Sequence, residues 1–307
     1  MRTLIIGGSG FIGRNLAAML GEQEHEVFVL DRVPDETDST GTIYIVGEAQ
    51  DSEIIYSALE QSDPQVVYHL AANSDISAGI LDASLDFGDT LMTTIALCQA
   101  LERHPVETLV FASSSAIFGN VGGPIAESID GFLCPESWYG KAKLASEYVI
   151  EAFSHDHPQT AILITRFPNV VGPKATHGVV YDFLRKLKAD PNKLQVLGNG
   201  HQEKPYVHVG DLIAGIEHFR SQAVAGDVLR VNIGPTDTLT VREIVAIVTR
   251  ALELSPEVYY EEQEFGWVGD IPKYEFDATR MRDGGFVIHA SSAKAVDRAV
   301  RDLIAEA

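Results

Sequence analysis

The start of the chain holds the feature that most restricts its fold. A short apolar strand at residues 3–6 runs directly into a turn with glycines at every third position, and a helical pattern follows at residues 14–20. In such a turn Gly7 allows the tight bend, Gly10 lets a phosphate approach the backbone, and Gly13 permits the helix to pack closely on a sheet. The helix N-terminus adds N–H groups and a positive dipole end. The order predicts a nucleotide-binding strand, turn and helix.

Strands and helices continue to alternate through the first half of the chain. Further strands are expected near residues 26–30, 42–46, 65–70 and 108–112, with helices near 51–61 and 82–102. This order predicts an α/β fold, a doubly wound parallel sheet of the Rossmann type, whose ligands lie at the carboxyl ends of the strands.

An acidic residue follows the second strand. Asp31 stands eighteen positions after Gly13, where a carboxylate can accept a hydrogen bond from a ribose 2′-hydroxyl and repel a 2′-phosphate. The neighbouring Arg32 could instead accept that phosphate. The balance favours NAD over NADP as the cofactor.

Tyr139 and Lys143 stand four residues apart in a helical pattern, downstream of a cluster of three serines at residues 113–115. Positions i and i+4 share one face of a helix, so the lysine ammonium can lie beside the phenol. A nearby cation favours the phenolate, which is expected to lower the tyrosine pKa toward the range of a general base. The pair predicts hydride chemistry on a hydroxyl group.

The regular alternation stops after Pro173. Residues 1–173 and 205–234 are predicted to form the NAD-binding domain, and residues 174–204 and 235–307 a smaller, discontinuous α+β domain for the substrate. In the second half, Thr240 is a plausible N-cap, with Glu243 completing a capping box.

The charge balance bears on possible partners. Against 23 basic residues there are 44 acidic ones, a formal net charge of −21, which argues against nucleic acid and anionic membranes as partners. No apolar run approaches the length of a membrane span, so a cytoplasmic protein is expected. Neither Cys98 and Cys134 nor the ten histidines have metal-ligand spacing, and no metal is predicted.

Taken together, the motifs resemble those of the extended short-chain dehydrogenase/reductase family, specifically its NAD-dependent sugar-nucleotide epimerases and dehydratases. The resemblance spans nearly the whole chain and rests on the glycine turn, Asp31, and the segments 69–72, 113–119, 139–143, 166–173 and 206–211.

The resemblance assigns roles to individual residues. It implies that Ser114 hydrogen-bonds the sugar hydroxyl, that Tyr139 is the base, and that Lys143 holds the nicotinamide ribose. Ser113 or Ser115 could take the serine role instead. The implied cofactor contacts are Gly7, Gly10, Phe11, Ile12, Gly13, Asp31, Arg32, Glu48, Ala49, Leu70, Ala71, Ala72, Tyr139, Lys143 and Pro168. The implied substrate contacts are Ser114, Tyr139, Asn169, Val180, Lys204 and Asp270.

Two positions depart from the family pattern. Lys204 stands where many members have an arginine that grips the diphosphate, and a lysine is a point charge rather than a fork. Trp267 lies where a second arginine is common. Asp270 is similar to an acid that contacts the nucleotide ribose, although an aspartate after glycine is often only a turn residue.

The resemblance implies epimerisation of a nucleotide sugar at C4, of the UDP-glucose/UDP-galactose type. Dehydration is disfavoured, because Ser115 and Ala116 replace the acidic residues of the dehydratases. The alternatives are another NAD-dependent nucleotide-sugar oxidoreductase or dehydratase, and a non-catalytic dinucleotide sensor. The helices at residues 82–102 and 139–153 resemble those that pair in the family's homodimers, so a homodimer is expected.

Overall fold

The chain divides into two compact units. The computed structural model describes residues 1–38, 40–73, 75–121, 123–127, 133–266 and 271–306. The first unit comprises Met1–Ile117, Trp138–Arg166 and Ile216–Val231; the second comprises Phe118–Ser137, Phe167–Gly215 and Asn232–Ala307. The predicted domain boundaries, 1–173 with 205–234 and 174–204 with 235–307, stay a prediction about which segments bind cofactor and substrate.

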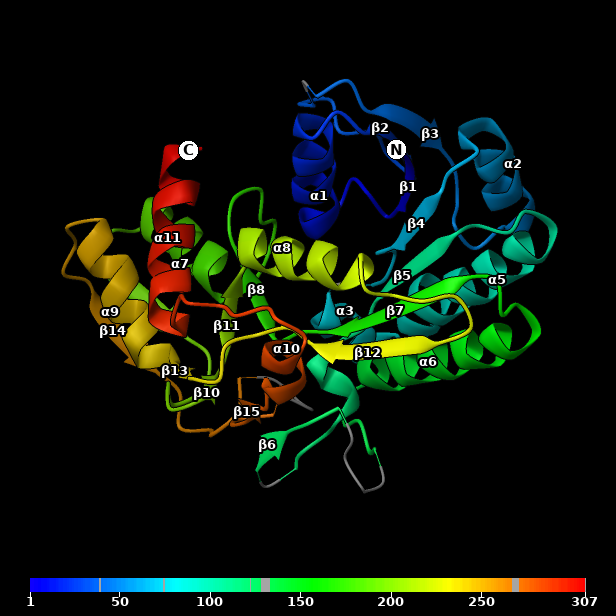
Figure 1. Ribbon diagram of the computed structural model, residues 1–307. Coiled ribbons are helices and arrows are strands. Elements are labelled where there is room, and N and C mark those ends of the chain that lie inside the picture. Colours follow the sequence, from blue (N-terminus) through cyan, green and yellow to red (C-terminus); the bar gives the residue numbers. More distant parts are fainter. Residues whose placement is uncertain (39, 74, 122, 128–132, 267–270, 307) are drawn as a thin grey trace. The chain divides into compact units, whose positions relative to one another are not determined.

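The first unit is built on a seven-stranded sheet with the order β12-β7-β5-β4-β1-β2-β3 (Figure 1). Its strands are β1 Arg2–Ile6, β2 Glu26–Asp31, β3 Ile43–Val46, β4 Val66–His69, β5 Thr108–Ala112, β7 Ala161–Arg166 and β12 Val228–Asn232. From β7 across to β3, each strand is parallel to its neighbour. Strand order reverses between β1 and β4, the position at which ligands bind in such sheets. The predicted doubly wound parallel sheet is confirmed.

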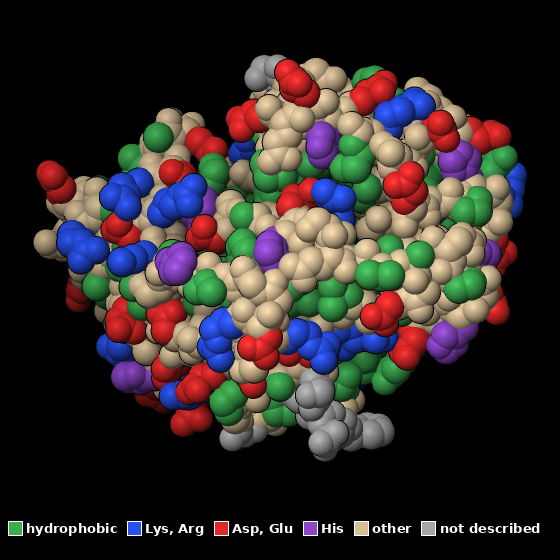
Figure 2. Space-filling model, viewed as in Figure 1, with side chains coloured by type: hydrophobic (Ala, Val, Ile, Leu, Met, Phe, Trp, Pro, Cys, Tyr) green, Lys and Arg blue, Asp and Glu red, His purple; other side chains and the backbone are tan. Residues whose placement is uncertain are grey.

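The outer surface reflects the acidic composition. Figure 2 shows acidic side chains distributed over the face that is drawn, with basic side chains between them. Among the described residues, the helices are all too short or too polar to cross a membrane.

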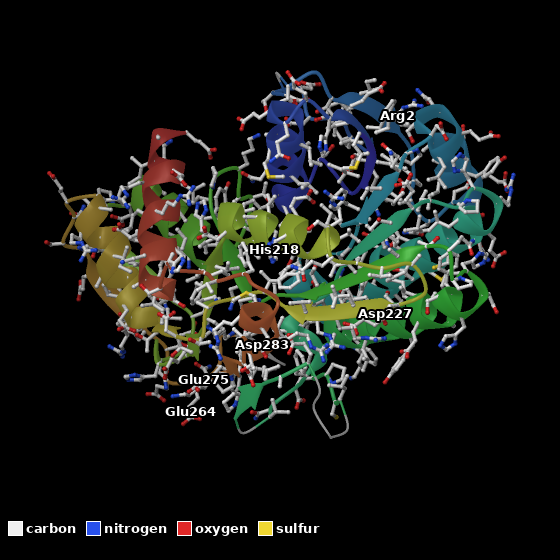
Figure 3. All side chains as sticks on the ribbon, viewed as in Figure 1. Arg2, His218, Asp227, Glu264, Glu275 and Asp283 are labelled. Carbon is white, nitrogen blue, oxygen red and sulfur yellow. The ribbon has the colours of Figure 1, made fainter. Side chains whose placement is uncertain are left out.

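Ion pairs gather at the amino ends of the central strands. Arg2, labelled in Figure 3, lies at the start of β1; its Nε is 3.3 Å from Glu26 at the start of β2 and its Nη1 is 3.5 Å from Asp63 before β4. These pairs are partly exposed, so each contributes little to stability. The amino ends of the strands are thus occupied by surface ion pairs, whereas the predicted site residues follow the carboxyl ends.

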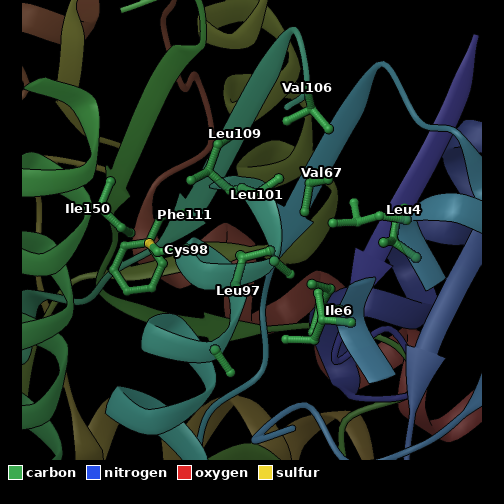
Figure 4. Close-up of a cluster of buried hydrophobic side chains, with 14 of the residues drawn as sticks. Leu4, Ile6, Val67, Leu97, Cys98, Leu101, Val106, Leu109, Phe111 and Ile150 are labelled. Carbon is green, nitrogen blue, oxygen red and sulfur yellow. The ribbon is translucent and has the colours of Figure 1, made fainter. Parts of the chain in front are cut away.

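Helices cover both faces of the sheet. The helices of the first unit include α1 Phe11–Glu22, α2 Ser52–Ser62, α5 Thr93–Arg103 and α6 Trp138–Asp156. On one face, Leu4 and Ile6 of β1 join a buried cluster with Leu97 and Leu101 of α5 (Figure 4). On the other, the hydroxyl of Tyr68 donates to Glu217 of α8 Val209–Arg220. Burial on both faces explains why the strands are apolar throughout rather than alternating.

The single helix expected at residues 82–102 is wrong in one respect. The segment consists of α4 Ala83–Asp86, a π-helix η1 Phe87–Met92, and α5, preceded by α3 Ile76–Leu81. Thr94 Oγ1 donates to the carbonyl of Thr90 at 2.9 Å, as does Thr93 Oγ1 at 2.9 Å. Hydroxyls that bond the preceding turn compete with the regular helical pattern. Sequence periodicity does not detect such an interruption.

Short strand pairs and helices make up the second unit. Its elements are β6 Pro124–Ile125, β8 Asn169–Val171, α7 Val179–Ala189, β9 Lys193–Val196, β10 Glu203–Lys204, β11 Tyr206–His208, β13 Leu239–Thr240, α9 Val241–Ala251, β14 Glu257–Tyr260, β15 Glu275–Phe276, α10 Thr279–Asp283 and α11 Ser292–Ala305. Apolar residues of α7, α9 and α11 form its core. The predicted capping box is confirmed: Thr240 accepts from the Glu243 backbone, and the Glu243 carboxylate accepts from Thr240 N at 2.8 Å.

Candidate active site

The glycine turn connects β1 to α1, and each of its three glycines has a different environment. Gly7 has a φ of +82°, and a Cβ there would lie 2.5 Å from the backbone N of Ala71. A Cβ on Gly13 would lie 2.5 Å from Gly8 Cα, so helix and turn are in close contact. At Gly10 the nearest atom to such a Cβ is 3.4 Å away. The space beside Gly10 is therefore left open, and the chain's own packing does not require this glycine.

The open turn fits a pyrophosphate. Gly10 is the N-cap of α1, and within the described chain no side chain caps the helix. Ser9 Oγ nearby is buried and has no hydrogen-bond partner among the described residues. An uncapped helix N-terminus with an open backbone approach is suited to bind an anion. Phe11, Ile12 and Gly13, all predicted contacts, form the first turn of this helix.

Asp31, at the end of β2, is held in a fixed orientation. The backbone N of Ser9 donates to Asp31 Oδ2 at 2.9 Å, and the backbone N of Arg32 donates to Oδ1 at 2.7 Å. The first bond ties the carboxylate to the glycine turn. Asp31 thus lies beside the turn, as a contact to the adenosine ribose of NAD requires.

Arg32 is engaged by carboxylates rather than available to a phosphate. Its Nε lies 2.9 Å from Glu48 Oε2, and its Nη2 also donates to Asp89. The hydrogen bond to Asp89 and the nearby negative charges raise the pKa of Arg32. A 2′-phosphate would have to compete with two carboxylates for this guanidinium, and this supports NAD over NADP.

The remaining predicted cofactor positions in the first unit follow β3 and β4. The backbone N–H groups of Leu70 and Ala71 both donate to the carbonyl of Ile6, at 2.9 Å each, which draws the end of β4 against the glycine turn. Glu48 and Ala49 follow β3, and Ala72 follows Ala71. The carboxyl ends of the neighbouring strands β4, β1, β2 and β3 therefore bring the predicted cofactor positions together.

The serine cluster follows β5, and its three hydroxyls have different surroundings. Ser113 is buried, and its hydroxyl donates to Glu147 at 2.5 Å. Ser115 is buried at the start of a 3-10 helix, Ser115–Ile117. Ser114 is hydrogen-bonded to Tyr139, and its Oγ accepts from the backbone N of Ala116 at 3.1 Å. Of the three alternatives, the geometry favours Ser114.

Tyr139 and Lys143 occupy the first turns of α6. Lys143 is buried, and its Nζ donates to the carbonyl of Ala112, at the end of β5, at 2.6 Å. Nζ is 4.8 Å from the ring centroid of Phe111 and 5.9 Å from that of Tyr139. Burial lowers the pKa of Lys143 to about 7, and the negative charge of Glu147 opposes that shift. The lysine can therefore change its protonation near neutral pH.

The expected lowering of the Tyr139 pKa is not produced by the protein groups. Burial raises the pKa of Tyr139 to about 12; the hydrogen bond with Ser114 lowers it, and the charge of Asp86 raises it further. The Lys143 ammonium is directed at the Ala112 carbonyl, and its own positive charge is weakened by burial. Desolvation and the carboxylate of Asp86 both raise the pKa of Tyr139, and neither effect is visible in the sequence spacing.

Two residues of the second unit that were predicted to contact ligands, Pro168 and Asn169, also contact residues of their own unit. Pro168 packs against Gly234, where an added Cβ would lie 2.8 Å from Pro168 Cδ. Asn169 Nδ2 donates to Tyr274 Oη at 3.3 Å and to Pro205 O at 3.4 Å, next to Lys204 in β10.

Of the other residues discussed as substrate contacts, the structure describes Val180 but not Asp270 or Trp267. The Val180 side chain lies in the core of the second unit, so only its backbone could face a ligand. Asp270 and Trp267 lie outside the described residues. Across the described ranges, no three His, Cys, Asp or Glu side chains gather in a way that would hold a metal ion.

Comparisons with known proteins match the chain to one family. The pattern of the NAD dependent epimerase/dehydratase family matches residues 3–234. A putative UDP-glucose 4-epimerase of Methanocaldococcus jannaschii is 27% identical over 276 residues, which cover 86% of this chain and 87% of the relative. A dTDP-glucose 4,6-dehydratase of Streptomyces griseus is 30% identical over 224 residues, covering 72% and 66%.

A solved structure agrees with this match. The crystal structure of UDP-glucose 4-epimerase from Thermus thermophilus, in complex with NAD, has a TM-score of 0.86 at 28% identity and covers 98% of both chains. The relatives differ in the reaction that their names give, but they share the cofactor-binding fold. With its open glycine turn and oriented Asp31, the chain belongs to the NAD-dependent epimerase/dehydratase family, and its cofactor is NAD.

Proposed function

We propose that this protein epimerises a nucleotide sugar at C4, with UDP-glucose and UDP-galactose as the pair to test first. The observation that carries the proposal is the hydrogen bond between Ser114 and Tyr139, with Lys143 one helical turn beyond. This arrangement offers a sugar hydroxyl two adjacent oxygen groups, one to bind it and one to exchange its proton.

Each of the three side chains has a separate task. Tyr139 removes the proton of the C4 hydroxyl and later returns it, and Ser114 holds that hydroxyl by a hydrogen bond. Lys143 donates a hydrogen bond to the nicotinamide ribose. Bound NAD supplies a reversible hydride acceptor and, when oxidised, a positive charge that favours the phenolate. Because Tyr139 takes and returns the same proton, its pair with Ser114 is unchanged after one turnover.

We further propose that residues of the second unit bind the nucleotide diphosphate. We propose Asn169 and Lys204 as contacts to the phosphates or sugar, and the backbone at Val180 and the side chain of Asp270 as contacts to the nucleoside. The hydrogen bond from Asn169 to Pro205 supports placing the first two side by side. A lysine neutralises phosphate without the two parallel bonds of an arginine.

A coupled assay tests the reaction. The purified protein with NAD and UDP-galactose should yield UDP-glucose, and the reverse reaction should reach the same equilibrium mixture. If NAD is bound and no interconversion occurs in either direction, the proposed reaction is wrong.

A second candidate is net oxidation or dehydration of another nucleotide sugar, because the matched relatives include a dTDP-glucose 4,6-dehydratase. Ser115 and Ala116, which follow Ser114, carry no carboxyl group for eliminating water. Accumulation of NADH in proportion to product would identify an oxidation, and loss of water from the sugar, seen by mass spectrometry, would identify a dehydration.

We also propose a homodimer formed through the helices around η1 and α6. Three large apolar side chains on these helices and on α3 are exposed: Leu81 at 90%, Met92 at 45% and Tyr148 at 60%. Single exposed apolar side chains are common on protein surfaces, whereas exposed apolar side chains that form one patch are typical of surfaces that a partner covers. A second copy is the proposed partner, as in the family that the sequence resembles.

A further inference from the structure

A buried carboxylate lies one helical turn beyond Lys143. Glu147 follows Tyr139 and Lys143 on α6 at the next i+4 position, so all three share one face of the helix. Its side chain is 3% exposed. A carboxylate this deeply buried is costly unless it is paired and hydrogen-bonded. None of the roles assigned so far uses it.

The partners of Glu147 come from β7, from β12 and from the residue that follows β5. Arg166, the last residue of β7, grips it with two bonds, Nε to Oε1 at 3.0 Å and Nη2 to Oε2 at 2.6 Å. Ser113, directly after β5, donates to Oε1 at 2.5 Å. Arg230 of β12 lies further off, with its Nε 3.9 Å from Oε2. Glu147 therefore holds Ser113 against α6, and the next residue, Ser114, is the one hydrogen-bonded to Tyr139.

Glu147 is also the negative charge that acts on Lys143. The other groups around the ammonium are the carbonyl of Ala112, the ring of Phe111 and the imidazole of His69 on β4. Burial, together with the charge of Lys143, lowers the pKa of His69 to about 3, so this imidazole is neutral at working pH. Tyr139 is neutral below its pKa of about 12. Arg166 and Arg230 both pair with Glu147, and the charge of Asp86 acts on Tyr139.

We propose that Glu147 is a positioning residue of the active site with two effects: through Ser113 it holds the Ser113–Ser114 turn against α6, and its negative charge favours the ammonium form of Lys143. The inference deepens the proposed function and rests on it for its effect on turnover. Its effect on Lys143 is independent of any substrate.

Three variants separate the two effects. Glu147→Gln removes the charge, Ser113→Ala removes only the anchor, and Arg166→Met leaves the carboxylate less compensated. Glu151→Gln is the matched control, since Glu151 lies one turn further along α6 and pairs at the surface with Arg230 at 2.9 Å. Each is made in the full chain, and NMR of isotope-labelled lysine follows the titration of Lys143.

The expected shifts have opposite signs. Loss of the negative charge disfavours the ammonium, so Glu147→Gln should lower the midpoint of the Lys143 titration by about one pH unit. Arg166→Met should raise it, and Ser113→Ala and Glu151→Gln should leave it unchanged. A purely structural Glu147 would not produce opposite shifts. Equal midpoints in Glu147→Gln, Arg166→Met and the control would overturn the electrostatic part.

Turnover tests the anchor. Ser113→Ala should lower kcat several-fold with NAD binding unchanged, because the neighbouring Ser114 is no longer held against α6. A wild-type kcat in Ser113→Ala would overturn the proposal that the bond from Ser113 to Glu147 positions Ser114. Because Ser113→Ala keeps the buried ion pair of Glu147 and Arg166, this test remains valid even if Glu147→Gln does not fold. If the Lys143 titration shifts as expected but no nucleotide sugar is epimerised, the proposed function fails while the electrostatic role of Glu147 stands.

Discussion

Tyr139 has a high pKa and a hydrogen bond to Ser114, and these two properties define its task. A phenol with a pKa of about 12 is a strong base once it has lost its proton, and the hydroxyl of Ser114 lies within hydrogen-bond reach of it. The groups of the chain alone keep it protonated. In the proposed role as the base, Tyr139 therefore needs bound cofactor and substrate to lower its pKa.

Replacing Tyr139 by Phe should reduce kcat by roughly 10²–10⁴-fold, the usual contribution of a positioned acid–base group. NAD binding should persist, because the glycine turn and Asp31 are untouched. Tyr148→Phe is the matched control, since Tyr148 lies on the same helix and is 60% exposed. Steady-state kinetics measures the first effect, and calorimetric titration with NAD measures the second. Substantial activity in Tyr139→Phe would mean that another group is the base.

His69 gives the fold a specific sensitivity to acid. Its pKa is lowered to about 3 in the folded chain, chiefly by burial, against about 6.5 when unfolded. The unfolded chain therefore binds a proton more readily between these values, and stability should fall as the pH drops from about 6.5 towards 3.

In His69→Gln this part of the acid sensitivity should disappear. The difference in unfolding free energy between pH 7 and pH 5, measured by urea titration, should be smaller than in the wild type by roughly 1–2 kcal/mol. His155→Gln, at an exposed position of α6, is the control. An identical loss of stability in all three proteins would contradict the assignment.

The turn between β1 and α1 uses its glycines for two different purposes. Gly7 and Gly13 are required by the packing of the chain itself, since a Cβ on either would lie 2.5 Å from backbone atoms. Gly10 has room for a side chain within the protein. Gly7 and Gly13 therefore serve the packing of the turn, whereas Gly10 leaves room for a ligand.

Two alanine variants should separate these purposes. Gly13→Ala should destabilise the fold by about 1–3 kcal/mol, because backbone atoms must move apart. Gly10→Ala should unfold like the wild type but bind NAD roughly tenfold or more weakly, a loss of at least about 1.4 kcal/mol. Gly123→Ala, where no atom lies within 4 Å of the added Cβ, is the control. Thermal unfolding and NAD titration distinguish the cases; unchanged NAD affinity in Gly10→Ala would mean that the pyrophosphate lies elsewhere.

Local patterns predicted the elements well where one interaction decides the structure. The strand and helix order, the glycine turn and the Thr240 capping box follow from spacing alone. The π-helix at Phe87–Met92 was not predicted, because the periodicity of apolar residues does not distinguish it from a continuous α-helix. The raised pKa of Tyr139 and the buried Glu147 likewise depend on which side chains the fold encloses, and no sequence spacing reports burial.

At the scale of the whole molecule, the proposed homodimer would form through the first unit. If a second copy covers the exposed side chains of Leu81, Met92 and Tyr148, light scattering should give the mass of a dimer. Replacing Met92 and Tyr148 by Glu should shift the protein toward the monomer, because burying a carboxylate in an apolar interface is costly. A wild-type monomer at high concentration would contradict the proposed interface.

The central claim is that hydride leaves C4 of the sugar and returns to the same carbon. The most direct measurement uses UDP-galactose with deuterium at C4, incubated with the protein and NAD, and follows the label by mass spectrometry and NMR. If the hydride returns to C4, the UDP-glucose formed should retain the deuterium at C4, with no net NADH. Product that has lost the label from C4, or no UDP-glucose from protein with NAD bound, would contradict it.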